Sequence, residues 1–199
     1  TGVTFNSTTS NAPLFCCNID SCGIGASISG CDPLLEWGSI YKNSLYGVRN
    51  EGRNASPTLL NTWIYNCGNS QAGYAGYYGY NSSKALLESC VLHDDTSSGV
   101  YLTSKATVWM RNSRVYHNIP YGMLLDSVGS NYWTTLQGSR IYDNTGIGIY
   151  LKSASSLRGW YADPLPAVQD RWMVADSLGR NCIRNNGIAT DTANTANIR

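Results

Sequence analysis

The stretch RVYHNIPYGM at residues 114–123 returns 26 residues later as RIYDNTGIGI at residues 140–149. Both copies hold an aliphatic residue followed by tyrosine, then asparagine, and finally glycine followed by an apolar residue. Sequence similarity at a fixed period of about 20–50 residues is typical of solenoid proteins. We therefore searched the rest of the chain for further copies of this unit.

The aliphatic position recurs seven times, and we name these residues the anchors. They are Ile19, Ile40, Ile64, Val91, Val115, Ile141 and Ile183. Leucine or methionine stands five residues before each anchor, at Leu14, Leu35, Leu59, Leu86, Met110, Leu136 and Leu178. The anchors are 21 to 27 residues apart, except for a final gap of 42 residues. Columns that hold across seven units predict one continuous stack of coils.

Each unit predicts a strand that ends at the anchor, a turn, and a second strand that opens at glycine. Alternate side chains of a strand share a face, so the anchor and the small residue two positions before it point inward. The asparagine three residues after the anchor suits the left-handed conformation of a sharp turn. We expect these asparagines to hydrogen-bond in a ladder, with Asp94 as the substitute in the fourth unit. Glycine opens the second strand, for example at Gly23, Gly73 and Gly99.

Composition excludes several classes of protein. The 199 residues include 14 Lys+Arg and 13 Asp+Glu, and this balance without basic blocks argues against nucleic-acid binding. No apolar run is long enough to span a membrane. Seven cysteines and two histidines do not match a zinc pattern, so we predict no metal and no cofactor. We expect buried free thiols, with a Cys16–Cys22 or Cys22–Cys31 disulfide as the alternative in a secreted protein.

The aliphatic-Tyr-x-Asn-x-x-x-Gly-apolar pattern resembles the right-handed parallel β-helix superfamily over about residues 12–190. The resemblance implies an all-β fold, a right-handed parallel β-helix solenoid of about seven coils in one domain over residues 1–199. We expect an insertion at about residues 155–177 to fold against the rod or a neighbouring subunit, or to overhang a groove as a lid. A polar tail follows at residues 191–199. Because no end caps are evident, we expect the chain to be part of a longer protein or an assembly.

Two columns that flank the anchors point outward and carry aromatic and arginine side chains. Such a face suits sugar rings, a subunit interface, or cross-strand stacking that only stabilises the sheet. The predicted substrate-binding residues of these columns are Tyr41, Trp63, Tyr65, Tyr116, Tyr142, Arg114 and Arg140. Tyr46 and Tyr121 join them from the loops between asparagine and glycine. The Gly-Tyr stretch at residues 72–80 is expected to replace a regular strand, either as an adaptable binding loop or as filler.

Candidate catalytic residues gather in the fourth and fifth units. His93, Asp94 and Asp95 form the densest acid–base cluster, and His117 is placed one coil later at the position equivalent to His93. With Asp143 they could meet across coils about 4.8 Å apart, as general acid–base groups or as a carboxylate pair for glycoside hydrolysis. Glu88 with Arg111 or Arg114 is a weaker pairing. A purely structural role near the turn is the alternative.

Three functions remain open. The first is a phage spike- or fibre-like module, trimeric and on a virion surface or extracellular, that binds and perhaps cleaves polysaccharide. The second is a non-catalytic structural or decoration protein of a virion or other extracellular assembly. The third is a secreted polysaccharide lyase or epimerase. The superfamily contains pectate-lyase-like enzymes, polysaccharide hydrolases, epimerases and bacteriophage tailspikes, but the residue sets of pectate lyases and polygalacturonases are not traceable in this chain.

Overall fold

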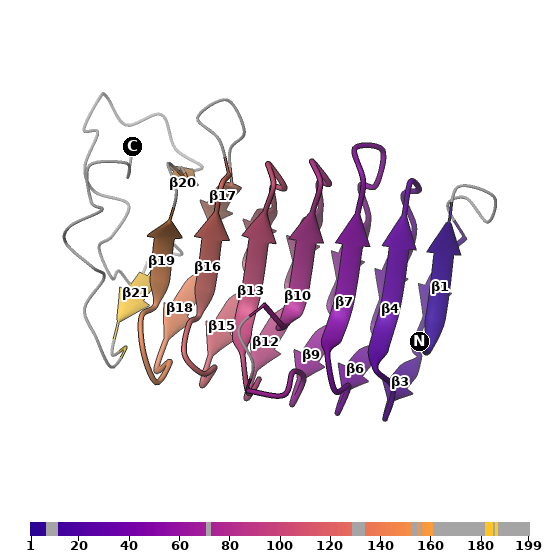
Figure 1. Ribbon diagram of the computed structural model, residues 1–199, viewed down its shortest axis with the longest axis horizontal. Helices are drawn as coiled ribbons and strands as arrows, with labels where there is room; N and C mark the ends of the chain where they lie inside the picture. Colours follow the sequence, from indigo (N-terminus) through magenta and orange to yellow (C-terminus); the bar gives the residue numbers. More distant parts are fainter. Residues whose placement is uncertain are drawn as a thin grey trace.

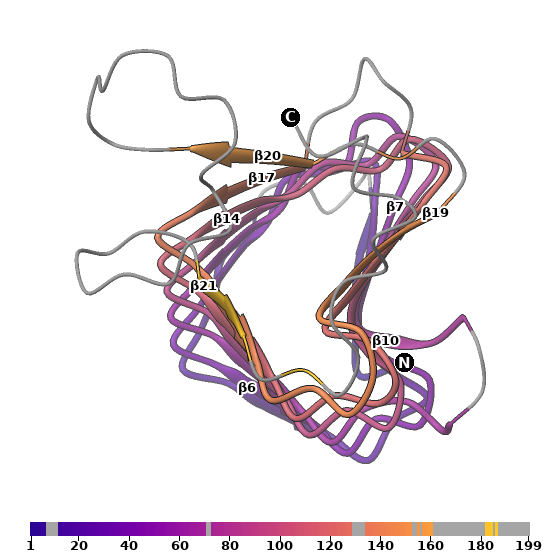
Figure 2. The ribbon, with the colours of Figure 1, turned by 90° about the vertical axis from the view of Figure 1, so that its left-hand side faces the viewer.

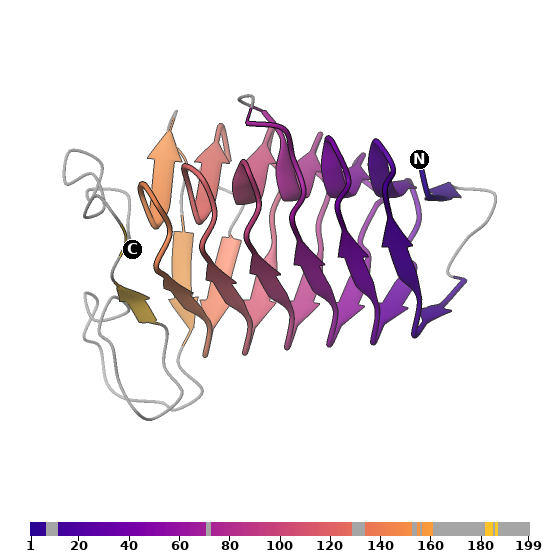
Figure 3. The same cartoon turned by 90° about the horizontal axis from the view of Figure 1, so that it is seen from below.

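The computed structural model describes residues 1–6, 12–70, 73–128, 134–152, 155, 157–160, 182–184 and 186. Every regular element of this part of the chain is a β-strand, and the strands form three parallel sheets of seven (Figures 1 and 3). The chain visits the sheets in turn, so that each strand pairs with strands one coil away. Seen end-on, the sheets are the three walls of a rod (Figure 2). The expected all-β parallel solenoid is confirmed, with about six full turns from β1 to β19.

Strand bounds follow the repeat closely. Sheet A consists of β1 Val3–Asn6, β4 Ile24–Ser29, β7 Tyr46–Glu51, β10 Ala75–Tyr80, β13 Ser98–Thr103, β16 Met123–Asp126 and β19 Ile149–Lys152. Sheet B consists of β2 Leu14–Phe15, β5 Leu34–Glu36, β8 Thr58–Leu60, β11 Leu86–Glu88, β14 Trp109–Arg111, β17 Thr134–Gln137 and β20 Leu157–Trp160. Sheet C consists of β3 Asn18–Asp20, β6 Ser39–Tyr41, β9 Trp63–Tyr65, β12 Val91–His93, β15 Arg114–Tyr116, β18 Arg140–Tyr142 and β21 Cys182–Arg184.

The core fills the rod with columns of aliphatic side chains. Sheet C contributes Ile40, Ile64, Leu92, Val115 and Ile141, all at most 1% exposed. Sheet B faces them with Leu35, Leu59, Leu87, Met110 and Leu136, all at most 3% exposed. Burying one such side chain stabilises a fold by about 1.5–3 kcal/mol. The stack of coils therefore supplies the apolar contact that a single unit lacks.

The fourth unit is shifted by one residue from its predicted register. Leu92, not Val91, aligns with Ile64 and Val115, and Val91 is only half-buried. Because both residues are aliphatic, alternation alone cannot choose between them, and a slip of one residue exchanges the two faces of a strand. The shift also puts three other residues in the inward columns of this unit. They are Leu87 in place of Leu86, Cys90 in place of Ser89, and Asp95 in place of Asp94.

The predicted ladder is confirmed at the corner between sheets C and A. Asn118 N–H donates to Asn144 Oδ1 at 3.0 Å, and Asn118 Nδ2 donates to the same oxygen at 3.1 Å. The left-handed residue is not the ladder asparagine, however, but the residue directly before it. These residues have φ between 52° and 55° and are Lys42, Asn66, Asp94, His117 and Asp143. The ladder residue can therefore turn its side chain inward, where it satisfies backbone groups that would otherwise be buried without partners.

A glycine column lies against this ladder because the coils approach closely there. A Cβ at Gly122 would lie 2.5 Å from the Gly148 carbonyl oxygen and 2.7 Å from Asn144 Nδ2. The first and third units place Gly25 and Gly76 in this column, so the predictions of Gly23 and Gly73 were wrong. In both units another glycine precedes the column glycine in sequence, and this earlier glycine was the one predicted.

The Gly-Tyr stretch does not replace a regular strand, contrary to the prediction. Residues 75–80 are strand β10 of sheet A, paired on both sides with β7 and β13. Tyr77 is fully buried, and its hydroxyl accepts a hydrogen bond of 2.9 Å from Asn50 Nδ2. Burial raises the pKa of Tyr77 well above its usual value.

The first residues of the predicted insertion form a strand of the solenoid. Residues 157–160 form strand β20, which pairs with β17, so they belong to the solenoid. The described residues do not include 161–181, which contain the predicted Leu178, or the predicted tail at residues 191–199. The six cysteines whose side chains are described are all free. Within the described ranges, no helix is long and apolar enough to cross a membrane.

Candidate ligand-binding face

The outer surface of sheet C carries two columns of side chains, which we name the ring column and the arginine column. Sheet C is the wall that holds β6 and β21 in Figure 2. The ring column follows the inward residues and contains Asp20, Tyr41, Tyr65, His93, Tyr116 and Tyr142. The arginine column precedes them and contains Asn18, Ser39, Trp63, Val91, Arg114 and Arg140. Alternation along the short strands puts both columns on the same solvent-facing side.

Five rings of the ring column form one continuous stack. Neighbouring centroids lie 5.0–5.1 Å apart, and neighbouring planes are within 15° of parallel. Four members, Tyr41, Tyr65, Tyr116 and Tyr142, were predicted, whereas His93 was missed because the fourth unit was one residue out of register. Since each inner ring is covered on both faces, the stack offers edges and hydroxyl groups to a ligand rather than free ring faces.

Free aromatic faces come instead from exposed tryptophans. Trp63 in the arginine column is 51% exposed and meets the His93 ring edge-on, with centroids 5.9 Å apart. Trp37 is 61% exposed at the corner between sheets B and C, where its φ is 56°. Trp109 is 44% exposed on sheet B and was not among the predicted site residues. Its outward place in a regular strand was the signal that could have identified it.

The two predicted arginines are direct neighbours. Arg114 of β15 and Arg140 of β18 are paired across adjacent strands, and both are exposed. Within the described part of the chain, no ion pair joins either guanidinium to a carboxylate. Like charges directly opposite one another on a sheet are unfavourable. The pair therefore forms a positively charged spot that an anionic group would stabilise.

Asp94 connects the two histidines at the edge of this face. Its Oδ2 lies 2.7 Å from His93 Nδ1, and its Oδ1 lies 3.4 Å from His117 Nδ1. His117 is equivalent in the fold to Asp94 and not to His93, so the predicted column was wrong, although Asp94 contacts both histidines. Asp143 follows in the next coil, where its carbonyl accepts the His117 N–H at 3.2 Å. An imidazole oriented by a carboxylate is a common arrangement for a general base.

The remaining predicted acids lie elsewhere. Asp95 is fully buried in the ladder, so it does not share the outer face with Asp94 and cannot form a carboxylate pair with it there. Glu88 lies on sheet B, where its carboxylate is 3.4 Å from the Arg111 guanidinium. That guanidinium also lies over Trp109, 5.4 Å from the ring centroid. The predicted pairing of Glu88 with Arg111 is therefore present, but away from the histidines.

Tyr46 and Tyr121 lie on a different wall of the rod. Tyr46 stacks on Tyr78 with centroids 4.8 Å apart, and Tyr78 meets Tyr101 at 5.3 Å. Tyr121 lies 5.3 Å from Tyr150. These tyrosines cover the outer surface of sheet A, and we name them the sheet A tyrosines. The predicted binding residues are thus divided between two faces that point in different directions.

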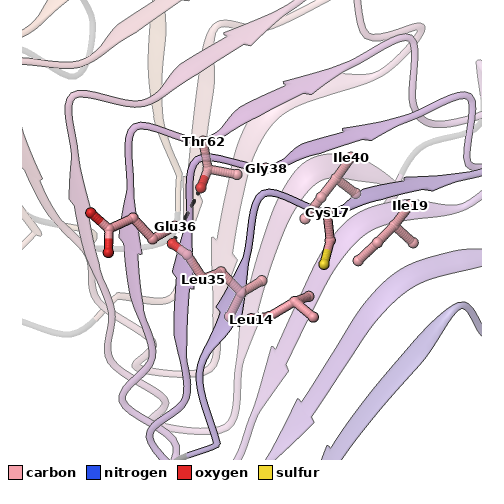
Figure 4. A pocket seen from close by; sticks show the side chains of 8 residues that line it. All are labelled: Leu14, Cys17, Ile19, Leu35, Glu36, Gly38, Ile40 and Thr62. Atoms are coloured by element: carbon pink, nitrogen blue, oxygen red, sulfur yellow. Dashed lines mark hydrogen bonds between the residues drawn. The ribbon is translucent and has the colours of Figure 1, made fainter.

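A cavity of about 10 Å³ lies inside the first coils, and its lining residues are shown in Figure 4. Cys17, Gly38 and Thr62 occupy equivalent inward positions in three successive coils. The cavity lies beside Gly38 because glycine has no side chain to fill this space. A space of this size holds at most one water molecule. Among the described residues, no group of three or more His, Cys, Asp or Glu side chains is arranged to hold a metal.

Comparison with known proteins agrees with this architecture. The model of the right-handed β-helix region family matches residues 1–159, a span that contains β1 to β19. No curated protein and no solved structure matches the chain. Three parallel sheets, visited in turn and joined by a ladder at one corner, are the structure that this match implies. The chain belongs to the right-handed β-helix family.

Proposed function

We propose that this chain is a spike- or fibre-like β-helix module that binds a cell-surface polysaccharide along the outer face of sheet C. The observation that carries the proposal is the arginine column. There the exposed indole of Trp63 is followed, after Val91, by two adjacent guanidiniums that form no ion pair with a described residue. Sugars present apolar C–H faces to aromatic rings and hydroxyl or carboxylate groups to arginine. The hydroxyl edges of the ring stack add hydrogen-bonding groups beside this row.

The geometry favours an extended polymer over a small molecule. Trp63 and Arg140 lie three strands apart in sheet C, which corresponds to roughly 14 Å at the spacing of neighbouring strands. An exposed face of this length suits several consecutive sugar units. Each contact is solvent-exposed and weak, so we expect affinity to come from several sugar units bound together.

Cleavage of the bound polysaccharide is the finer part of the proposal. His117 would act as general base, with Asp94 as the residue that orients it. His93 would act only through Asp94, because it is enclosed between Tyr65 and Tyr116. Asp143 and Glu88 have no assigned part in this step.

A binding assay against a panel of purified neutral and acidic polysaccharides tests the proposal. We expect Trp63→Ala and the double variant Arg114→Ala/Arg140→Ala to lose most of the binding, by about tenfold or more. Trp109→Ala, which removes an equally exposed indole from sheet B, is the matched control and should bind like the parent protein. Absence of binding to every polysaccharide, or equal loss in the control, would refute the proposal. Depolymerisation by the parent protein but not by His117→Gln would support the catalytic step.

A structural role in a virion or other extracellular assembly is the second candidate. It is favoured by the sheet A tyrosines, because tyrosine is enriched at protein interfaces and these residues are away from sheet C. The oligomer would be a homotrimer that buries this wall. Native mass and cross-linking of the purified chain test it: a monomer at all concentrations would refute it. The third function, a secreted lyase or epimerase, gains no support from the six free cysteines.

A further inference from the structure

The ladder holds a carboxyl group in the fourth coil, where the coils after it hold amides. Asp95 is fully buried, and its Oδ1 accepts the Cys67 N–H at 2.8 Å. The Asp95 N–H in turn donates to Asn118 Oδ1 at 3.1 Å. Asp95 Oδ1 thus accepts a backbone N–H of the preceding coil, as the amide oxygen of Asn118 does in the next coil. The second oxygen, Oδ2, has to take the place of an amide nitrogen.

In the asparagines of the ladder, the side-chain nitrogen Nδ2 donates hydrogen bonds to oxygen atoms of other coils. Asn118 Nδ2 donates to the Leu92 carbonyl at 3.4 Å and to Asn144 Oδ1 at 3.1 Å. Asn144 Nδ2 donates to the Val115 carbonyl at 3.4 Å. Asp95 Oδ2, by contrast, is buried and has no hydrogen-bond partner among the described residues. An ionised Asp95 could only accept hydrogen bonds at this position, where the asparagines of the ladder donate to oxygen atoms. Burying a charged oxygen without a donor costs free energy of folding.

Among the described residues, no positive charge compensates for this carboxyl group. Oδ2 lies against Gly76, so closely that a side chain at that glycine would collide with it. The titratable groups that face it are the buried Cys67 thiol and the neighbouring carboxylate of Asp94. Burial raises the pKa of Cys67 to about 12, so this thiol is neutral. Asp94 has the same sign as an ionised Asp95, and Asn118 is uncharged.

We propose that Asp95 is held in the folded chain as a neutral carboxylic acid with its proton on Oδ2, and that the fourth coil loosens when this proton is lost. The acid then acts as a substitute for asparagine, because its O–H can donate where the other rungs use an N–H. Burial is the main cause that raises the pKa of Asp95 well above its usual value, and the charge of Asp94 adds to it. The hydrogen bond from Cys67 opposes the shift but is the smaller effect.

The sign of the pH dependence follows from proton binding. The unfolded chain loses this proton at about pH 4, while the folded chain keeps it to a much higher pH. The contribution of Asp95 to stability is therefore fully present below about pH 4. Above that pH, the unfolding equilibrium constant rises by about tenfold per pH unit until the folded-state pKa is passed.

Urea unfolding of the parent chain and of Asp95→Asn between about pH 4 and pH 9 tests the proposal. We expect equal stability of the two proteins near pH 4 and a growing advantage of Asp95→Asn as the pH rises. The two proteins differ only at residue 95, so pH effects that they share cancel in the difference. Asp94→Asn removes the neighbouring charge and should keep a pH-dependent loss. Parallel profiles of the parent and Asp95→Asn would overturn the proposal.

Two further measurements make the test independent of one variant. Asn118→Asp puts an acid into the ladder one coil after Asp95. This variant should lose more stability than the parent as the pH rises, because it buries a second carboxyl group. Infrared spectroscopy should show the C=O band of a protonated carboxyl group in the folded parent at neutral pH, and this band should be missing in Asp95→Asn. A parent spectrum without the band would overturn the proposal even if the variant failed to fold.

Discussion

The imidazole of His93 lies parallel to the ring of Tyr65, with centroids 5.0 Å apart and planes within 7°. It lies equally close and parallel to Tyr116 on its other side. A histidine in the middle of a tyrosine stack connects this stack to Asp94, because the same ring contacts the Asp94 carboxylate. Offset-stacked aromatic pairs contribute about 0.5–1.5 kcal/mol each beyond their buried area.

Loss of the His93 ring should therefore weaken the stack on both sides. We expect His93→Ala to lower the free energy of unfolding by about 1–3 kcal/mol, since two ring contacts disappear. His93→Tyr keeps both contacts and should stay within about 1 kcal/mol of the parent. Urea unfolding followed by circular dichroism measures both variants. Equal destabilisation by alanine and tyrosine would show that the contact with Asp94, not stacking, is what matters.

Close approach of the coils makes Gly122 intolerant of a side chain. Gly122→Ala puts a Cβ 2.5 Å from a backbone oxygen and should destabilise the fold by about 1–3 kcal/mol or more. Gly23→Ala is the matched control, because its nearest neighbour would be a leucine methyl carbon 3.8 Å away. Thermal unfolding of the two variants distinguishes them. A lower Tm for Gly23→Ala than for Gly122→Ala would contradict the glycine column.

Ser113 joins two coils at the corner between sheets B and C. Its hydroxyl oxygen accepts the Cys90 N–H at 3.1 Å, and its O–H faces the Leu87 carbonyl at 3.1 Å. Ser113→Ala leaves the buried Cys90 N–H without a partner, which should cost about 1–3 kcal/mol. Ser113→Thr retains the hydroxyl, as Thr62 does two coils earlier, and should recover most of the loss. Chemical unfolding of both variants is the measurement.

Cysteine reactivity should separate the coil interior from the surface. Burial raises the pKa of both Cys67 and Cys90 to about 12, so their thiolate fraction at neutral pH is negligible. Cys16 is exposed and should react with iodoacetamide in the native protein. Mass spectrometry of labelled peptides checks this, with urea-unfolded protein as the control in which all three cysteines react. Native labelling of Cys67 before Cys16 would contradict the described packing.

Much of the fold follows from sequence periodicity. The pairing of Val115 with Ile141 and of Arg114 with Arg140 could be predicted because a parallel solenoid superimposes successive units. The ladder asparagines and most of the ring stack followed from the same columns. By contrast, the free face of Trp63 and the covered faces of its neighbouring rings depend on packing across coils, which periodicity does not describe.

The repeat by itself determined that this chain is a solenoid, which residue columns it stacks, and that tyrosine and arginine gather on its surface. Only the tertiary structure decided the register of the fourth coil, because Val91 and Leu92 are both aliphatic and contact with Ile64 and Val115 had to select one. That one-residue choice moved His93 into the ring stack and Asp95 into the interior. The physical reason is that a strand alternates faces at every residue, so packing against the neighbouring coils assigns each side chain to water or to the core.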